Sequence, residues 1–287
     1  MTALIATDLD RTMIYSAAAL SEGSGSQGPG DITCVEMYDG APLSYMTVRA
    51  VAMLTELAAT AVVVPTTTRT TEQFQRIALP GAPWRYAITA NGGTILVDGE
   101  PDRAWRDAVD AAVRASAAPL SDVVAEMTRR SGSTSGTDPS WVLKQRVADD
   151  LFCYLVVDVS AMPTDFTRDF GQWCTDHGWG LSQQGRKIYA MPDAVCKSRA
   201  IAEVKRRLVA DRTLDPSAQV LAAGDGALDA EMLRAADAAI RPRHGELELL
   251  QWQTPGLVVT ELTGGAASEE ILSWFLATRN RTSVHVR

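Results

Sequence analysis

The stretch "ALIATDLDRT", residues 3–12, does most to decide the fold. A short apolar run ends there in two aspartates, Asp8 and Asp10, which are separated by a single residue. An apolar run that turns abruptly acidic is typical of a buried parallel strand whose carboxyl end opens onto a site. Two carboxylates this close repel each other, so we expect something in the fold to offset the repulsion. The alternative is a turn or a helix cap, where aspartate is common.

The composition is that of an ordinary globular protein. Of the 287 residues, 46% are hydrophobic and 22% are charged, and the length suffices for one large domain or two modest ones. The formal net charge of −8 argues against binding to nucleic acid or to an anionic membrane surface, because neither attracts an acidic protein.

Cysteine usage and hydropathy predict a cytoplasmic location. The four cysteines lie far apart without CxxC spacing, so we expect reduced thiols and neither a disulfide framework nor a zinc site. The strand-like run at the N-terminus leaves no room for a signal peptide. No apolar stretch approaches the roughly 20 residues of a membrane span.

The segment after the first strand is predicted to hold a loop, a hairpin and a helix. Residues 21–30 are too poor in apolar side chains to pack. Residues 32–46 are expected to form a hairpin that turns at Asp39 and Gly40. Apolar residues at helical spacing then predict a helix over 48–59, which leads into the β-branched strand that ends in the threonine cluster.

The pattern changes between residues 102 and 189. The segment begins with alanine-rich helices. They are followed by strands in which apolar and polar residues alternate, as is typical of antiparallel sheets, so the segment has its own α+β character. From residue 190 the alternation of helix and strand returns. We therefore predict an α/β protein with a Rossmann-like parallel-sheet core, residues 1–101 and 190–287, and an inserted α+β cap domain at 102–189.

Four polar features fall at the ends of predicted core strands or at the starts of the helices after them. They are the Asp8–Asp10 pair, the threonine–arginine run 66–70, Lys197, and the Asp225–Asp229 pair. The carboxyl ends of the strands in an open parallel sheet line the ligand crevice. We therefore expect these residues, far apart in sequence, to converge at one edge.

This set of residues suits phosphoryl transfer through an aspartate. A carboxylate can attack phosphorus and form an acyl-phosphate, but a hard cation must offset the repulsion between the two anions. Magnesium prefers oxygen ligands, and Asp8 and Asp225 supply carboxylates. A carboxylate two residues beyond the nucleophile, here Asp10, can protonate the leaving oxygen and later activate water. A lysine would balance the negative charge, and a threonine hydroxyl can donate to the phosphate.

These segments resemble the motifs of a known group. "DLDRT" resembles the first motif (DxDxT) of the haloacid dehalogenase (HAD) superfamily phosphatases, "VVVPTTTR" the second, "CKSRAI" the third and "GDGALDAEML" the fourth. "ITANGG" is similar to a segment that follows the second motif in the sugar-phosphate phosphatase branch. That branch carries a cap domain between its second and third motifs. The order of four motifs makes the resemblance far more specific than any one of them alone.

The resemblance implies a role for each matching residue. Asp8 would be the nucleophile and Asp10 the general acid and base, with the backbone carbonyl of Asp10 also on a magnesium ion. Lys197 would balance charge, and Asp225 and Asp229 would be metal ligands together with Asp8. Each of these residues, taken alone, could have a purely structural role; Lys197, for example, could be a solvated lysine on a helix. The order of the motifs favours the functional interpretation.

The threonine cluster leaves a choice of register. Aligning "TTR" with the branch's usual "TGR" selects Thr67 as the phosphate-binding hydroxyl and pairs it with Arg69, but Thr66 is the alternative. Asn91, in "NGG", is a candidate for substrate binding as well as a turn residue. Leu228 stands where the branch commonly has asparagine before its last aspartate.

Candidate substrate contacts also come from the predicted cap. Lys144 and Arg186 are predicted to reach an anionic or hydroxylated substrate, although charges on a strand are usually solvated. His244 follows the last core strand, and we expect it on a surface loop. It has no partners at ligand spacing, which argues against zinc.

The sequence therefore predicts a magnesium-dependent phosphomonoester hydrolase that forms an aspartyl-phosphate. Its partner would be a small phosphomonoester, either a phosphorylated sugar or a related metabolite. Two alternatives stay open. One is a phosphomutase of the same fold, and the other is a protein that senses a phosphorylated ligand without turning it over.

Overall fold

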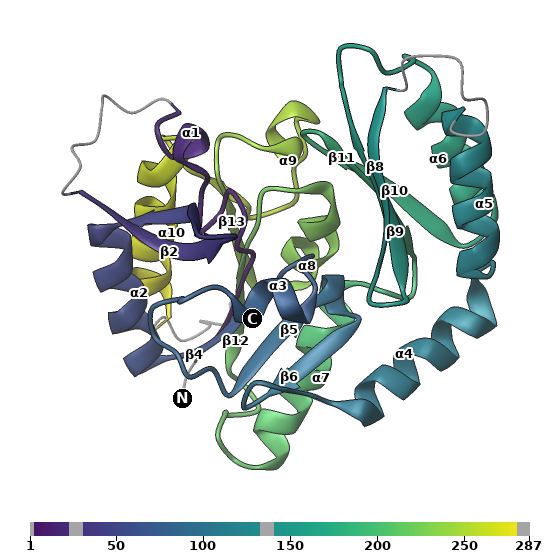
Figure 1. The fold of residues 1–287 in the computed structure, drawn as a ribbon. Coiled ribbons are helices and arrows are strands. Elements are labelled where there is room, and N and C mark those ends of the chain that lie inside the picture. Colours follow the sequence, from purple (N-terminus) through teal and green to yellow (C-terminus); the bar gives the residue numbers. More distant parts are fainter. Residues whose placement is uncertain (1–2, 23–30, 133–140, 280–287) are drawn as a thin grey trace. The chain divides into compact units, whose positions relative to one another are not determined.

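The chain folds into two compact units, and each is described by itself (Figure 1). The structure is a computed structural model that describes residues 3–22, 31–132 and 141–279. The core unit comprises Met1–Asp102 and Lys197–Arg287, and the inserted unit comprises Arg103–Cys196. The sequence-based division places the second crossing at 189/190, seven residues earlier, whereas the last strand of the inserted sheet continues to Pro192.

A five-stranded parallel sheet forms the centre of the core unit. Its order is β14 (Val258–Val259), β13 (Ala238–Arg241), β12 (Gln219–Ala223), β1 (Ala3–Thr7) and β4 (Val62–Pro65). Every residue of β1 is buried, as its apolar sequence predicts for a buried parallel strand. The α/β core expected from the sequence is confirmed.

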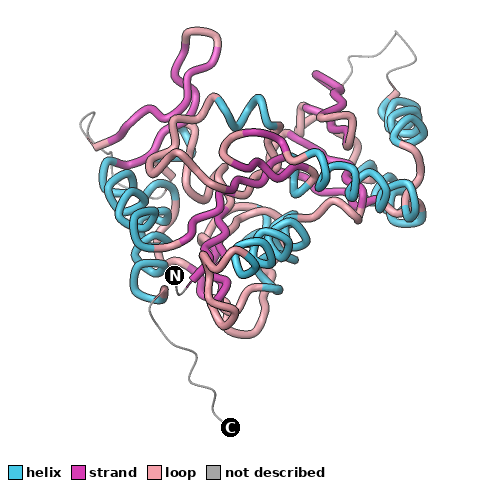
Figure 2. The backbone as a smooth tube through the Cα atoms, turned by 90° about the horizontal axis from the view of Figure 1, so that it is seen from below, coloured by secondary structure: helices cyan, strands magenta, loops and turns pink. Residues whose placement is uncertain are grey.

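Helices pack on both sides of the core strands (Figure 2). On one side α2 (Val48–Thr60) packs against α10 (Gly264–Thr278), and on the other α7 (Lys197–Ala210) packs against α8 (Ala230–Ala235). The hydroxyl of Thr47 caps α2 by accepting from the Ala50 amide, and it donates to Glu269 Oε1 of α10 at 2.7 Å. One threonine therefore ends the preceding strand, starts a helix and ties it to a second helix.

A β-hairpin follows β1 in the sequence, after the short helix α1 (Ala17–Leu20). Strands β2 (Ile32–Tyr38) and β3 (Ala41–Thr47) are antiparallel. The turn residues Asp39 and Gly40 have φ of 53° and 76°, as a two-residue hairpin loop requires, so the predicted turn is confirmed. Most of the loop predicted at 21–30 lies outside the described residues.

A second small sheet lies beside the end of β4. It contains β5 (Tyr86–Thr89), β6 (Thr94–Val97) and β7 (Glu100–Pro101), and β5 joins β4 through a Thr66–Ile88 bridge. The 3-10 turn Ala90–Gly92 connects β5 to β6, and Ala90 and Asn91 both have positive φ. The short helices α3 (Thr71–Gln75) and α9 (Glu246–Leu249) complete the core unit.

Both crossings between the units lie next to α7. The first core segment ends at Asp102, whose carboxylate accepts a hydrogen bond from Arg207 of α7. The Asp102 amide donates to the Ile95 carbonyl at 2.9 Å. The second core segment begins with Lys197, which is the first residue of α7.

The inserted unit has a four-stranded antiparallel sheet with helices on one face. The sheet order is β10 (Trp179–Gln184), β11 (Lys187–Pro192), β9 (Phe152–Val157) and β8 (Val142–Ala148). The helices are α4 (Arg103–Ser116), α5 (Leu120–Ser131) and α6 (Phe166–Asp176). Alternate residues of β9 are fully buried, in agreement with the predicted α+β character; they are Cys153, Leu155 and Val157.

No helix within the described residues is long and apolar enough to span a membrane. The four cysteines are free thiols in this structure.

Candidate active site

Four charged side chains are buried together at the carboxyl edge of the core sheet. Asp8 directly follows β1, Asp225 follows β12, Asp229 lies in the 3-10 turn Ala227–Asp229, and Lys197 opens α7. None of the four is more than 7% exposed. The sequence prediction that these segments converge is therefore correct for these residues.

Lys197 is the cation of this cluster. Its Nζ lies 2.6 Å from Asp8 Oδ1 and 2.5 Å from Asp229 Oδ1. Asp229 Oδ2 accepts from the Gly226 amide at 2.9 Å, and Asp8 Oδ2 accepts from the Thr12 hydroxyl at 3.3 Å. In both Asp8 and Asp229, one carboxylate oxygen therefore accepts a hydrogen bond from the Lys197 ammonium, and the other accepts one from an uncharged donor.

The cluster carries more negative than positive charge. Burial raises the pKa of Asp8 to about 7, although Lys197 acts in the opposite direction. Burial, with Asp8 and Asp229 nearby, raises the pKa of Asp225 well above its ordinary value. For Lys197, burial alone would lower the pKa, but attraction by Asp229 and Asp8 outweighs burial and raises it.

The same carboxylates fit a divalent cation. Asp8, Asp225 and Asp229 each offer an oxygen, and these three atoms lie within 4.8 Å of one another. An all-oxygen donor set with excess negative charge suits Mg²⁺ rather than a thiophilic metal. The residues present therefore fit the magnesium ion that the resemblance implies.

Two glycines lie in close approach to the carboxylates of Asp225 and Asp229. A Cβ on Gly245, which has a φ of +85°, would lie 2.3 Å from Asp225 Oδ2. A Cβ on Gly224 would lie 2.5 Å from the Asp229 side chain. Only glycine leaves room for the carboxylates at these positions.

Asp10 differs from the buried cluster because its side chain is 51% exposed. Arg69 binds it through two parallel bonds, Nε to Oδ2 at 2.7 Å and Nη2 to Oδ1 at 2.8 Å. Such a forked pair fixes both position and orientation. Among the residues predicted from sequence, Asp10 and Arg69 are thus in direct contact.

The two candidate threonines differ in how their hydroxyls are used. Thr66 Oγ1 donates to the Val64 carbonyl at 3.0 Å, so its proton is directed back into the strand. Thr67 Oγ1 instead accepts from the Arg69 amide at 3.2 Å, so its proton is left to donate elsewhere. The geometry favours Thr67 as the donor to a ligand.

Asn91 supports the same loop. The backbone N–H of Asn91 donates to the Thr67 carbonyl at 3.0 Å, and the backbone N–H of Ala90 donates to the Arg69 carbonyl at 2.7 Å. The Asn91 side chain is 2% exposed. The positive φ of both turn residues brings these amides to the threonine–arginine loop.

His244 is buried, which corrects the expectation of a surface loop. It is 7% exposed, and its Nε2 donates to the Arg11 carbonyl at 2.7 Å, while its Nδ1 accepts from the Gly264 amide at 3.3 Å. Burial lowers the pKa of His244, which favours this neutral form. The histidine connects the turn after Asp8 with the start of α10, and nothing in its local sequence indicates this.

Lys144 and Arg186 belong to the inserted unit. Lys144 lies on β8 and Arg186 lies in the turn between β10 and β11, and both side chains are exposed. Strand register places Lys144 and Arg146 on the same sheet face as Tyr154, which is paired with Tyr189. This face is basic and aromatic, and it is opposite the face that carries the buried β9 residues.

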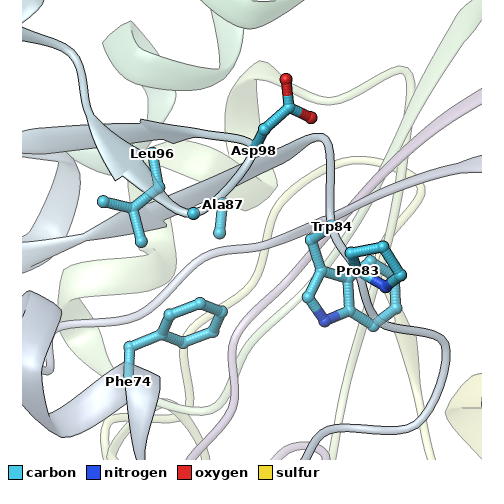
Figure 3. A pocket seen from close by; sticks show the side chains of 7 residues that line it. Phe74, Pro83, Trp84, Ala87, Leu96 and Asp98 are labelled. Carbon is cyan, nitrogen blue, oxygen red and sulfur yellow. The ribbon is translucent and has the colours of Figure 1, made fainter.

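A small apolar pocket in the core unit contains none of the predicted site residues (Figure 3). Its volume is about 150 Å³, and Phe74, Trp84 and Leu96 are among its lining residues. This volume is below that of typical ligand sites, which begin at about 300 Å³. We therefore assign the candidate site to the charged cluster.

Comparisons with known proteins identify the fold. Neither a protein-family model nor a curated protein matches the sequence. The sucrose-phosphatase from Synechocystis sp. PCC6803, solved with sucrose and phosphate, is similar in structure with a TM-score of 0.62 at 17% identity, covering 96% of this chain and 98% of that chain. Protein 0175 of Thermoplasma acidophilum gives 0.59 at 13% identity, with 96% and 99% covered. The HAD subclass IIB sugar phosphatase BT4131 gives 0.56 at 13% identity, again with 96% and 99% covered. The chain thus has the HAD fold with an inserted cap, as the motif resemblance predicts.

Proposed function

We propose that this protein is a magnesium-dependent phosphomonoester hydrolase that acts through an aspartyl-phosphate on Asp8. The observation that carries the proposal is the buried cluster in which Lys197 contacts both Asp8 and Asp229, with Asp225 beside them. A cluster of buried, mutually perturbed charges is costly to the fold and marks a site. The HAD fold of the neighbouring structures supports the proposal.

In the first step, an Asp8 carboxylate oxygen attacks the phosphorus of the substrate. A bond forms between this oxygen and phosphorus, and the bond to the leaving alcohol oxygen breaks. Asp10 gives its proton to that oxygen, so the product leaves as a neutral alcohol. Asp10 lies two residues beyond Asp8 and is half exposed, which suits a group that must reach the bridging oxygen.

In the second step, Asp10 takes a proton from a water molecule. The water oxygen attacks the phosphorus of the aspartyl-phosphate, and the bond between phosphorus and the Asp8 oxygen breaks. Inorganic phosphate is released and Asp8 is regenerated as a carboxylate. Lys197 keeps Asp8 ionised before the first step and after the second, because its ammonium lies 2.6 Å from Asp8 Oδ1.

A magnesium ion would be held by Asp8, Asp225 and Asp229 and by the backbone carbonyl of Asp10. When bound, it supplies the positive charge that lets an anionic nucleophile approach a phosphate dianion. The Thr67 hydroxyl would donate to a phosphate oxygen, since its own acceptor position is already occupied by the Arg69 amide.

The substrate is proposed to be a phosphorylated sugar or a related small polyol. Sucrose and phosphate accompany the Synechocystis enzyme, and BT4131 is a sugar phosphatase. Arg69 and Asn91 are the candidate contacts from the core unit, and Lys144 and Arg186 are those from the inserted unit. Guanidinium, ammonium and amide groups are suited to hydroxyl and anionic groups.

The proposal is tested by measuring phosphate release from a panel of phosphomonoesters that includes sucrose 6-phosphate, trehalose 6-phosphate and p-nitrophenyl phosphate. Wild-type protein with Mg²⁺ should release phosphate, whereas EDTA or Asp8→Asn should reduce the rate to background. Asp39→Asn, in the hairpin turn, is the matched control and should behave as wild type. If wild type released no more phosphate than Asp8→Asn from any monoester, the proposal would be wrong. Isomerised product without phosphate release would indicate the phosphomutase alternative.

A further inference from the structure

The β2–β3 hairpin carries a fully buried carboxylate, Glu36. Its side chain is 0% exposed. Glu36 Oε2 accepts from Ser44 Oγ at 2.6 Å and from Arg69 Nη1 at 2.8 Å, and Glu36 Oε1 lies 3.6 Å from Arg76 Nε. Withdrawing a carboxylate from water is expensive even when it is paired.

Arg69 joins this buried carboxylate to the exposed carboxylate of Asp10. Its Nη1 donates to Glu36, while its Nε and Nη2 donate to Asp10. All three guanidinium nitrogens are therefore engaged, and the side chain is only 15% exposed. The result is a chain of contacts that runs from the hairpin through one arginine to the proposed acid and base.

We infer that Glu36 is a positioning residue, which holds Arg69 so that Arg69 fixes the carboxylate of Asp10 for proton transfer. The inference rests on the proposed function and adds to it the role of the hairpin. Glu36 does not touch the reacting atoms and acts only through Arg69.

The physical reason lies in the rotamer freedom of the Arg69 and Asp10 side chains. An arginine side chain loses about 2 kcal/mol of rotamer entropy when it is fixed, and a half-exposed aspartate samples several rotamers of its own. A buried and immobile acceptor at Nη1 fixes the guanidinium plane before Asp10 binds to it. Misplacement of a catalytic group by about 1 Å can cost up to about 100-fold in rate.

The competing explanation is that Glu36 only stabilises the hairpin. A buried ion pair is weak support for stability, because apolar residues of similar volume do as well or better. The hairpin also has apolar anchors in the core cluster, namely Val35 and Met46. A stabilising role and a positioning role predict different kinetics.

The first test replaces Glu36 by glutamine and compares two leaving groups. An alcohol needs a proton to leave whereas p-nitrophenolate does not, so a misplaced acid slows only the former. We expect Glu36→Gln to lower the single-turnover rate of alcohol release from the best sugar phosphate of the panel by about 10- to 100-fold. The rate of p-nitrophenol release should change less than about threefold.

Two further variants separate positioning from folding. Val35→Ala removes an apolar anchor from the same strand and leaves the carboxylate in place, so it should lower Tm without changing the ratio of the two rates. Ser44→Ala removes one hydrogen bond to Glu36 and the 3.4 Å contact that Arg69 Nη2 makes with Ser44 Oγ, so it should change the ratio in the same direction as Glu36→Gln, but less. If Glu36→Gln failed to fold, Ser44→Ala would carry the test alone, and an unchanged ratio would overturn the inference.

A double mutant and a structure complete the experiment. Once Asp10→Asn has removed the acid, adding Glu36→Gln should slow alcohol release by less than about twofold, because both changes act on one step. If Glu36→Gln slowed alcohol release by the same factor in the Asp10→Asn background as in wild type, the inference would be contradicted. A crystal structure of Glu36→Gln in which Arg69 kept both bonds to Asp10 would also contradict it.

The outcomes distinguish this inference from the proposed function. If wild type hydrolysed no monoester, the proposed function and this inference would both be wrong. If wild type were active and Asp10→Asn were impaired, but Glu36→Gln matched wild type on both substrates, only the inference would be wrong.

Discussion

The ammonium of Lys197 lies 2.6 Å from Asp8 Oδ1, although 189 residues separate the two in sequence. The same ammonium also contacts Asp229, so one lysine serves two buried carboxylates. This relationship ties together the two segments of the core unit, because Asp8 belongs to the first and Lys197 opens the second.

Lys197→Met should destabilise the protein in a pH-dependent manner. Removing one partner of a buried charge cluster costs about 3–5 kcal/mol. Without the ammonium, the pKa of Asp8 rises further above its usual range, so the folded state binds more protons than the unfolded state at intermediate pH. Unfolding free energy then falls as pH rises. Thermal unfolding should show the smallest loss of Tm at pH 5 and the largest at pH 8.

Lys205→Met, on the same helix, is the control for the loss of a lysine. We expect it to leave Tm within about 2 °C of wild type at each pH, since it lies outside the cluster. A Lys197→Met variant as stable as this control at pH 8 would contradict the prediction.

Asp225→Asn should stabilise the metal-free protein and abolish its response to Mg²⁺. The raised pKa of Asp225 means that ionisation costs folding free energy, increasingly so as pH rises above the ordinary value of 3.8. A neutral side chain removes this cost, so Tm in EDTA at pH 8 should rise by about 3–8 °C. Differential scanning calorimetry with and without Mg²⁺ measures both effects. The prediction would be contradicted if Asp225→Asn had a lower Tm than wild type in EDTA, or if Mg²⁺ raised its Tm as much as it raises that of wild type.

Gly245→Ala should weaken metal binding by displacing a carboxylate. The new Cβ would meet Asp225 Oδ2 at 2.3 Å, so the carboxylate must move. We expect about tenfold weaker Mg²⁺ binding by calorimetric titration, corresponding to the loss of about one ligand interaction of 1.4 kcal/mol.

Gly256→Ala provides the matched control, because Gly256 has a similar φ of +76° and no atom within 4 Å of the added Cβ. It should carry only the backbone strain of about 1–2 kcal/mol and bind Mg²⁺ normally. Equal Mg²⁺ affinity in the two variants would exclude the crowding of Asp225 as the cause.

Thr67→Ala and Thr66→Ala should have different effects. Loss of a donor to the transferring phosphate costs about 100-fold or more in kcat, and we expect this for Thr67→Ala, with recovery in Thr67→Ser. Thr66→Ala removes a buried hydrogen bond to the Val64 carbonyl and should cost about 1 kcal/mol of stability, with kcat within about threefold of wild type. Steady-state kinetics and thermal unfolding measure both effects. A large loss of kcat in Thr66→Ala with little loss in Thr67→Ala would show that Thr66 is the phosphate donor.

The parts of the fold that local sequence determines could be predicted. The apolar run before Asp8 becomes an interior strand of the parallel sheet, Asp39–Gly40 makes the hairpin turn, and the helix predicted from residue 48 begins at Val48. The convergence of Asp8 with Lys197 followed from one rule, because parallel strands present their carboxyl ends at a common edge.

The parts that depend on tertiary contacts could not be predicted. Glu36 lies on a hairpin whose sequence alternates like any half-buried strand, and only packing against Arg69 and Arg76 makes it a buried charge. Gly245 approaches Asp225 and His244 binds the Arg11 carbonyl from the loop after β13, and both contacts depend on how that loop folds back. Strand β11 pairs with β10 and β9 as far as Pro192, and this pairing across the inserted sheet does not follow from local sequence.

The ion pair between Asp102 and Arg207 has a consequence for how such proteins diversify. The chain leaves the core at Asp102 and re-enters it at Lys197, and both points are fastened to the same helix, α7. The inserted unit is therefore joined to the core unit at two points that both lie next to α7. We expect inserted segments of different length and sequence to be tolerated between Asp102 and Lys197 without disturbing the charge cluster.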